Sequence, residues 1–236
     1  MQSLSVIIPA YNAAKTIIKT VAAAAKFLKE KKIDYEIIVV DDGSRDNTRE
    51  LLNTVSDSRI RILVNQNNRG KGFSIKRGVT ETTKDCILMT DADGAVPIET
   101  LENFLPHLNY DIIIGSKALQ SSKPLTRYPR HRRCGTFMLN FLTRLFLVKG
   151  ITDTQCGFKI LRAETAKKIF PKQTINRFGF DIEILYLAQK YGYRIKEIPV
   201  HWSHNPDSRV KPIRDGLEIL VDLIKIKINE FKKIYD

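Results

Sequence analysis

Two acidic residues separated by one small residue, Asp91 and Asp93, are the first candidates for chemistry in this sequence. They follow the apolar run 86–90, which is expected to form a buried strand, and Gly94 comes directly after them. Carboxylates in this arrangement can share a divalent cation, and their hard oxygen atoms favour Mg²⁺ or Mn²⁺. Such an ion would neutralise a departing diphosphate. A solvated turn would use the same residue types, so only the position of these residues in the fold can distinguish a metal site from a turn.

Two other polar segments also allow either a structural or a ligand-binding interpretation. Asp41-Asp42-Gly43-Ser44 could form a strand-to-helix turn with a capping residue, or it could use Asp42 to recognise a base or a ribose. The segment 68–72, Asn-Arg-Gly-Lys-Gly, could place Lys71 against a phosphate, because its glycines allow a close backbone approach. It matches neither the phosphate-binding loop of nucleotide triphosphatases nor the dinucleotide fingerprint.

The pattern of apolar residues in the first half predicts strands that alternate with helices. This alternation indicates βαβ units and a mostly parallel sheet, and therefore an α/β fold. Ligands of such sheets bind beyond the carboxyl ends of the strands. One crevice should therefore collect Asp41, Asp42, Asp91 and Asp93. The expected strands are 4–9, 35–40, 60–64, 86–90 and 111–115, and the expected helices are 16–32, one from 46, 71–82 and 98–108.

The second half is basic and apolar. Residues 117–133 contain six Lys or Arg residues and no acid, which is either a solvated loop or a phosphate-binding region. The predicted helices 137–148 and 213–235 are rich in Leu, Ile and Phe, and the second carries lysines toward its end. Each could pack in the core or lie in a lipid headgroup layer. We expect neither a membrane span nor a signal peptide.

Composition excludes several classes of protein. The 236 residues are 43% hydrophobic and 28% charged, as in ordinary globular domains, so disorder and coiled coil are not expected. Three scattered cysteines indicate neither a disulfide framework nor a structural zinc site. The net charge of +13 attracts polyanions. A nucleic-acid-binding module is not expected, because the run 117–133 offers only Tyr128 for base stacking.

Several motifs together resemble a known family. The sequence is similar to family 2 glycosyltransferases of the GT-A fold, and within them to dolichyl-phosphate β-glucosyltransferases and polyprenyl-phosphate mannosyltransferases. TDADGA and DTQCGFK are specific in combination, and the resemblance spans nearly the whole chain. The matching segments are VIIPAYN at 6–12, EIIVVDDGSRDNT at 36–48, NRGKG at 68–72, TDADGA at 90–95, GSK at 115–117, TDTQCGFK at 152–159, RFGFDIEILYLA at 177–188, EIPVHW at 197–202 and, more loosely, SRVKP at 208–212.

The resemblance implies a Rossmann-like, mixed and mostly parallel sheet flanked by helices, with amphipathic helices at the C-terminus. It also implies inverting transfer of a hexose, with UDP-glucose as donor and a polyprenyl phosphate as acceptor, at the cytoplasmic face of a membrane with an anionic surface. GDP-mannose as donor and a non-lipid acceptor are the alternatives. One domain over 1–236 is expected, with the nucleotide-sugar site in 1–116 and the acceptor and membrane-facing part in 117–236.

The family's functional residues can be transferred to matching positions. Asp93 would bind Mg²⁺ or Mn²⁺, and Asp91 would contact the donor and join the metal site. Asp153 and Gln155 would face the transferred sugar. The nucleotide sugar would be held by Pro9, Tyr11, Asp42, Lys71 and Asp91. Phosphate groups and the acceptor would be bound by Lys117, Arg133, Thr136, Asn140 and Arg209.

Two departures from the family pattern concern specificity. Ala13 stands where the family usually has an acid, and Lys117 stands where it has arginine, which keeps the charge but loses the bidentate fork. The reaction class is unaffected. A lipid phosphate has a second pKa of about 6, so it is largely dianionic at neutral pH and needs little help from a general base. The basic run 117–133 therefore fits a phosphate acceptor better than an alcohol.

Overall fold

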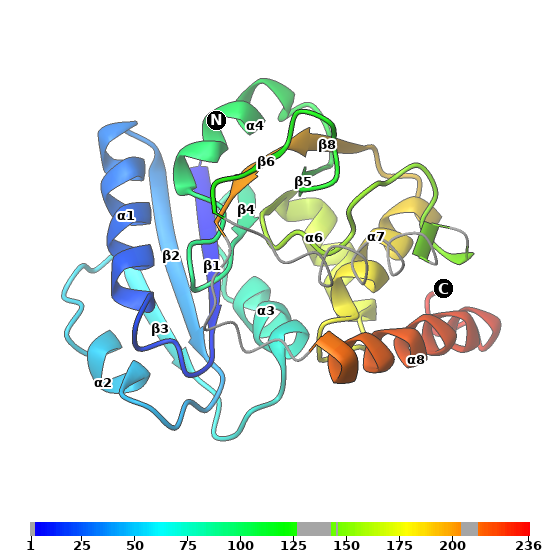
Figure 1. The fold of residues 1–236 in the computed structure, drawn as a ribbon, viewed down its shortest axis with the longest axis horizontal. Helices are drawn as coiled ribbons and strands as arrows, with labels where there is room; N and C mark the ends of the chain where they lie inside the picture. Colours follow the sequence, from blue (N-terminus) through cyan, green and yellow to red (C-terminus); the bar gives the residue numbers. More distant parts are fainter. Residues whose placement is uncertain (1–2, 127–142, 145, 204–211) are drawn as a thin grey trace.

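The structure is a computed structural model that describes residues 3–126, 143–144, 146–203 and 212–236 (Figure 1). Most of the predicted helix 137–148 lies outside these ranges. At its end, Phe146 is exposed, whereas Leu147 and Val148 are buried. Four predicted acceptor or phosphate contacts, Arg133, Thr136, Asn140 and Arg209, also lie outside the described residues.

A mixed sheet forms the centre of the fold, and the described residues give it seven strands in the order β3-β2-β1-β4-β7-β5-β8. Its neighbouring strands are parallel except at β7, which runs antiparallel to both β4 and β5. The strands are β1 (Ser3–Ala10), β2 (Asp34–Asp41), β3 (Ile60–Val64), β4 (Cys86–Met89), β5 (Ile112–Ser116), β7 (Lys159–Arg162) and β8 (Ile195–Pro199). Short strands β6 (Lys123–Pro124) and β9 (His201–Trp202) pair separately. The predicted α/β class with a mostly parallel sheet is confirmed.

Helices cover both faces of the sheet, because its strands carry apolar side chains on both sides (Figure 1). One core contains the buried face of α1 with Val6, Ile8 and Val39. The other contains Ile7, Ile38 and Val40 with residues of α3, α6, α7 and α8. The helices are α1 (Ile17–Glu30), α2 (Thr48–Leu52), α3 (Lys71–Thr80), α4 (Leu101–Phe104), α6 (Ala163–Ile169), α7 (Phe180–Lys190) and α8 (Pro212–Phe231).

Two predicted helices differ from those observed. The segment 98–108 forms only α4 between the 3₁₀ turns Ile98–Thr100 and Leu105–His107, because Pro106 has no N–H to continue a helix. The C-terminal helix ends at Phe231 rather than at Tyr235. Lys233 has a φ of 58°, and the chain turns there so that the Tyr235 side chain is fully buried.

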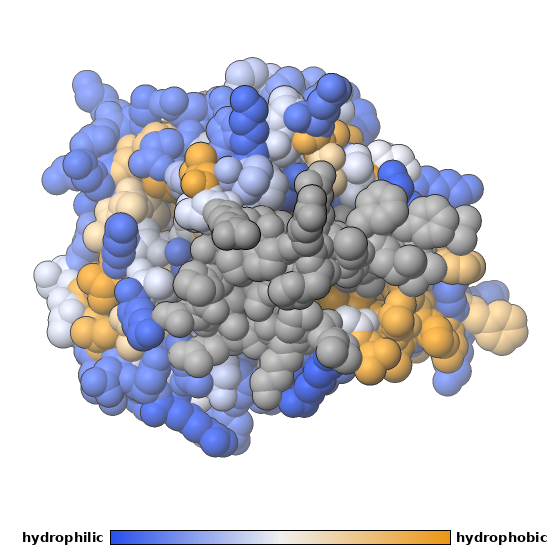
Figure 2. Space-filling model, in the orientation of Figure 1, coloured by the Kyte–Doolittle hydropathy of each residue, from blue (hydrophilic) through white to orange (hydrophobic). Residues whose placement is uncertain are grey.

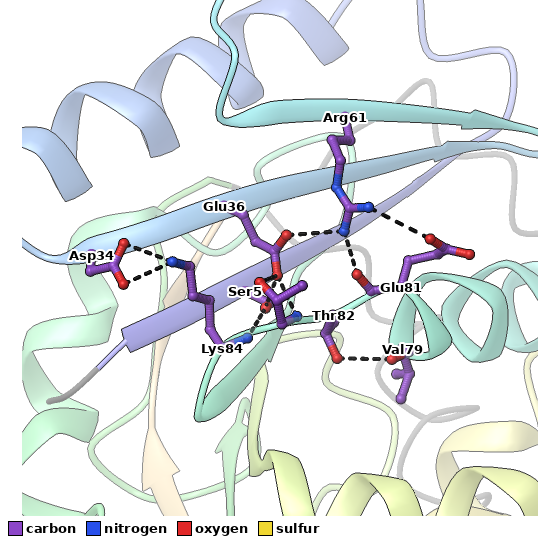
Figure 3. Close-up of polar contacts among 9 residues, drawn as sticks. Ser5, Asp34, Glu36, Arg61, Val79, Glu81, Thr82 and Lys84 are labelled. Carbon is purple, nitrogen blue, oxygen red and sulfur yellow. Dashed lines mark hydrogen bonds and ion pairs between the residues drawn. The ribbon is translucent and has the colours of Figure 1, made fainter.

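A polar network lies at the amino ends of the strands, opposite the ends where ligands are expected (Figure 3). Glu36 of β2 accepts hydrogen bonds from the Ser5 hydroxyl at 2.6 Å, from the Thr83 N–H at 2.7 Å and from Arg61 at 3.0 Å. Burial alone would raise the pKa of Glu36, but these hydrogen bonds and the Arg61 charge outweigh it and lower the pKa. The network fixes β1, β2, β3 and the loop before β4 relative to one another.

Candidate active site

The carboxyl ends of β1, β2 and β4 meet where the strand order reverses, with β2 on one side of β1 and β4 on the other. This is the position where open α/β sheets bind ligands. The loop after β1 is tied to the loop after β2, since the Asn12 N–H donates to the Ser44 hydroxyl at 2.9 Å and the Ala13 N–H to the Thr48 hydroxyl at 2.8 Å. Pro9 and Tyr11 are partly buried beside this junction. These hydrogen bonds hold the loops after β1 and β2 together at this edge of the sheet.

The Asp42 carboxylate supports the loop 68–72. It accepts hydrogen bonds from the Arg69 N–H at 2.9 Å and the Gly70 N–H at 2.7 Å, and from the Asn65 amide at 2.7 Å. Gly70 has a φ of 102°, a conformation that side chains other than glycine rarely adopt, and the loop delivers Lys71 to the first turn of α3. The side chain of Asp42 is buried and acts on this loop.

Lys71 forms an ion pair with Asp91 at this edge of the sheet, with 2.7 Å between Nζ and Oδ1. Burial alone would lower the pKa of Lys71, but the Asp91 and Asp181 carboxylates raise it above its ordinary value. Burial likewise would raise the pKa of Asp91, yet the Lys71 ammonium holds it below its ordinary value. Both side chains are therefore charged at neutral pH. The structure thus brings together Lys71 of the segment 68–72 and Asp91 of the segment 90–95, which only the family resemblance had assigned to one site.

Asp91 is enclosed on another side by Gly157 of the segment 152–159. A Cβ at position 157 would lie 2.2 Å from Asp91 Oδ2, so only glycine leaves room for this carboxylate. Asp93 accepts a hydrogen bond from the Ala95 N–H at 3.0 Å and lies within Coulombic range of Lys71. Two carboxylates in such a cradle suit a divalent cation that takes its other ligands from phosphate and water. Among the described residues, no group of three or more His, Cys, Asp and Glu side chains could hold a metal ion without such help.

The segment 153–157 lies beside the start of the basic region. The Asp153 carboxylate accepts hydrogen bonds from the Lys117 N–H at 2.9 Å and the Gln155 N–H at 3.0 Å, and the Asp153 N–H donates to Glu197 at 2.9 Å. Asp153 is buried and shapes its own loop. The Gln155 side-chain nitrogen is enclosed without a hydrogen-bond partner in the part of the chain that the structure describes. Burial raises the pKa of the Cys156 thiol to about 11, which fits a packing role.

A second ion pair, between Lys159 and Asp181, lies near the first and was not predicted from the sequence. Lys159 of β7 is completely buried, and its Nζ lies 2.5 Å from Asp181 Oδ1 and donates to the Cys156 carbonyl. Glu183, two residues along α7, instead accepts from the N–H groups of Thr174 and Ile175 and from the Tyr235 hydroxyl. The motif DTQCGFK contained Lys159, but nothing in its spacing indicated burial. Asp181 thus supports the site, and Glu183 supports a loop and the C-terminus.

A separate polar hollow of about 570 Å³ lies at the ends of β2 and β3. It is lined by Asp41, Ser44, Arg45 and Arg49 with residues 64–68, and its lining includes neither Lys71 nor Asp91. The charge cluster around Asp91 consists of Lys71, Asp91 and Asp93. It combines opposite charges, the space left by Gly157 and a position where the strand order of the sheet reverses. The cluster is therefore the better candidate for the reaction centre.

Solved structures with this fold include two synthases. Glucosyl-3-phosphoglycerate synthase from Mycobacterium tuberculosis, crystallised with Mn²⁺, uridine diphosphate and glucosyl-3-phosphoglycerate, matches with a TM-score of 0.69 and 18% identity, over 95% of this chain and 80% of that one. Mannosyl-3-phosphoglycerate synthase from Rubrobacter xylanophilus matches with a TM-score of 0.71 and 15% identity, over 98% and 75%. At these identities the likeness establishes the fold, which is of the GT-A type.

The family follows from sequence. The family model described as Glycosyl transferase family 2 matches residues 5–170, and this range contains the Lys71–Asp91 pair and the Gly157 cradle. The chain belongs to glycosyl transferase family 2 and is a glycosyltransferase.

Curated proteins with assigned names are more similar in sequence to this chain than these two solved structures are. The chain is 37% identical to the dolichyl-phosphate β-glucosyltransferase of Dictyostelium discoideum, over 95% of this chain and 73% of that protein. It is 32% identical to the enzyme of the same name from Homo sapiens, over 96% and 75%, and 32% identical to that from Saccharomyces cerevisiae, over 98% and 76%. The resemblance drawn from the motifs is confirmed.

Proposed function

We propose that this chain transfers glucose from UDP-glucose to a dolichyl-type polyprenyl phosphate at a membrane surface, with inversion at the anomeric carbon. The observation that carries the proposal is 37% identity, over 95% of the chain, to a dolichyl-phosphate β-glucosyltransferase. A neighbour of the same fold crystallised with Mn²⁺ and uridine diphosphate supports the choice of donor. The charge cluster around Asp91 supports the chemistry, because it can stabilise a departing nucleoside diphosphate.

On the donor side, Pro9, Tyr11 and the loop held by Asp42 would enclose the nucleotide, and Lys71 would bind its diphosphate. Asp91 and Asp93 would hold Mg²⁺ or Mn²⁺, which would supply Lewis-acid neutralisation of the leaving diphosphate. Gln155 would donate its unpartnered amide to a hydroxyl of the sugar, since an enclosed donor without a partner is costly and a bound hydroxyl would satisfy it. Asp153 would orient Gln155 and Lys117 through their backbone N–H groups.

On the acceptor side, a phosphate dianion attacks without losing a proton, so the residues must bind it beside a second anion. Lys117 would do this together with Arg133, Thr136, Asn140 and Arg209. In this proposal residues 1–116 bind the nucleotide sugar and residues 117–236 bind the acceptor and face the membrane. The segment 153–159 then adds Gln155 and the Asp91 cradle to the donor site from the second part.

Helix α8 supports the membrane location. Its inner face packs in the core through Ile219, Leu223 and Ile226, which are at most 7% exposed. Its outer face carries a stripe of exposed apolar residues spaced four and three apart, and Figure 2 shows this apolar surface over α8. The stripe consists of Leu217, Val221, Ile224, Ile228 and Phe231, which are 47–89% exposed.

The inner face of α8 therefore fits the core interpretation, and its outer face fits the interfacial interpretation. Lys225 and Lys227 are exposed on the same helix and Lys232 directly after it, and such a combination suits an anionic lipid surface. In the part of the chain that the structure describes, no helix combines the length and the apolar composition that a bilayer-spanning segment requires. The proposal places the enzyme at the cytoplasmic face of a membrane, and its structural support is the exposed apolar stripe of α8 with the neighbouring lysines.

The test is a donor panel. UDP-glucose, other UDP-sugars and GDP-mannose would be offered with Mg²⁺ or Mn²⁺ and a short polyprenyl phosphate, and labelled product would be extracted into detergent. The proposal expects detergent-extractable product that is formed fastest from UDP-glucose. Turnover with GDP-mannose alone, or product that stays in water with a soluble acceptor, would contradict it.

A further inference from the structure

The Lys71–Asp91 ion pair lies at the position where the proposed function requires a divalent cation. The two side chains are only 17% and 34% exposed, and 2.7 Å separates their charged atoms. Solvent therefore weakens their attraction much less than that of a surface pair. A cation that approaches Asp91 meets a carboxylate already neutralised by an ammonium group.

The surrounding fold holds the two partners close to each other. Gly157 leaves no space behind the Asp91 carboxylate, since a Cβ there would lie 2.2 Å from Oδ2. The loop that carries Lys71 is held by the two N–H groups that donate to Asp42, and Gly70 packs against the Asn176 carbonyl. The pair is thus built into the fold rather than formed between two mobile surface chains.

The cation also has few alternatives in the described residues. They contain no group of three or more potential ligands, so binding depends on Asp91, Asp93 and whatever oxygen atoms a ligand brings. Binding to Asp91 would place a divalent cation close to the Lys71 ammonium, and these like charges repel. A diphosphate removes this conflict, because its oxygen atoms can bind the cation and accept hydrogen bonds from lysine at the same time.

We propose that Lys71 competes with the divalent cation for Asp91 in the donor-free enzyme and transfers to the donor's diphosphate when the nucleotide binds, so that cation and nucleotide bind together. The inference rests on the proposed function, because it requires a nucleotide diphosphate beside Lys71 and Asp91. The coupling is reciprocal, so the cation must strengthen nucleotide binding by the same factor by which the nucleotide strengthens cation binding.

Direct binding of Mn²⁺, followed by electron paramagnetic resonance, tests the proposal without an activity assay. Wild-type protein and Lys71→Met would be titrated with Mn²⁺, each with and without UDP. We expect UDP to tighten Mn²⁺ binding to the wild type at least tenfold, which corresponds to about 1.4 kcal/mol. We expect Lys71→Met to bind Mn²⁺ alone at least fivefold more tightly than the wild type, with a smaller effect of UDP.

The matched control is Lys76→Met. Lys76 lies on the same helix and donates to the carbonyls of Pro171 and Gln173, so its removal changes the net charge equally without touching Asp91. We expect its Mn²⁺ affinity to equal that of the wild type. Circular dichroism would verify that both variants are folded.

The outcomes separate the two proposals. If Lys71→Met binds Mn²⁺ alone no more tightly than the wild type or the control, Lys71 is not a competitor, and the proposed function is unaffected. If UDP leaves the wild-type affinity for Mn²⁺ unchanged, the coupling is absent and the inference is wrong. If the wild type binds neither UDP nor Mn²⁺ in the presence of UDP, the proposed donor site itself is wrong.

Discussion

The ion pair between Lys159 and Asp181 is enclosed by protein, with side chains that are 0% and 4% exposed. Replacing Lys159 with methionine removes the ammonium but keeps most of the side-chain volume. The Asp181 carboxylate would then be buried without its ion-pair partner, and the Cys156 carbonyl would lose its donor. We expect the free energy of unfolding to fall by about 3–5 kcal/mol, the range for breaking a buried pair from one side.

This loss is large compared with a total stability of roughly 5–15 kcal/mol for a domain. In a protein of this size, it corresponds to a fall in Tm of about 6–20 °C. The double variant Lys159→Met/Asp181→Leu removes both charges and should recover most of the loss, because paired apolar residues of similar volume replace buried ion pairs at little cost. The double-mutant cycle should therefore give a coupling energy of about 2 kcal/mol or more.

Urea unfolding at pH 7, followed by circular dichroism, would measure all four proteins. Lys84→Met provides a matched control, because Lys84 pairs with Asp34 at 2.8 Å but the Asp34 side chain is 64% exposed. We expect the control to lose at most about 1 kcal/mol. A loss for Lys159→Met no larger than that of the control would refute the argument that burial makes this pair critical.

Three other perturbations test the polar network, the inner face of α8 and its outer face. Glu36→Gln should lower stability by about 1–3 kcal/mol at pH 7. The difference should shrink below about pH 4, because the stabilisation is complete above the unfolded pKa near 4.5 and is lost as the pH falls through the lowered pKa of the folded state. Asp222→Asn should raise stability by about 1 kcal/mol above pH 6, because burial raises the pKa of Asp222 to about 6 and penalises the ionised form. Ile224→Glu should weaken sedimentation with phosphatidylserine vesicles at least tenfold, since it places a charge in the apolar stripe, whereas Leu125→Glu, at similar exposure beside β6, should not.

Each of these three predictions would be contradicted by a specific measurement. Thermal melts of Glu36→Gln that run parallel to the wild type from pH 3 to pH 8 would show that ionised Glu36 does not stabilise the fold. A gain for Asp222→Asn that persists at pH 3.5 would point to packing rather than charge. Equal vesicle binding by the Ile224 and Leu125 variants would remove the membrane role from the α8 stripe.

The sequence alone determined the parallel part of the sheet. Strands β1 and β2 are buried on both faces, so they read as short β-branched runs, and such runs are recognisable without knowledge of their partners. The acidic residues that follow β2 and β4 had to share one edge, because both strands run parallel to β1 and parallel strands end on the same side. The family motifs were equally local, and the resemblance assigned Lys71, Asp91 and Asp93 to one donor and metal site.

The tertiary structure alone decided how the second half completes this site. Strand β7 begins with Lys159, and its pairing with β4 and β5 joins segments far apart in the chain, so no local periodicity marked it. The carboxylates of Asp42 and Asp153 could equally have faced a ligand. They accept backbone N–H groups because the fold brings those donors within 3 Å.

Contacts between distant segments also explain why the ion pairs and the two faces of α8 could not be predicted from the sequence. A sequence states which groups carry charge or apolar surface, whereas the partner that compensates each group depends on contacts between distant segments. Lys71 with Asp91, Lys159 with Asp181, and the division of α8 into a buried and an exposed apolar face are all of this kind. Local chemistry therefore specified what this site contains, and long-range packing specified which charge neutralises which.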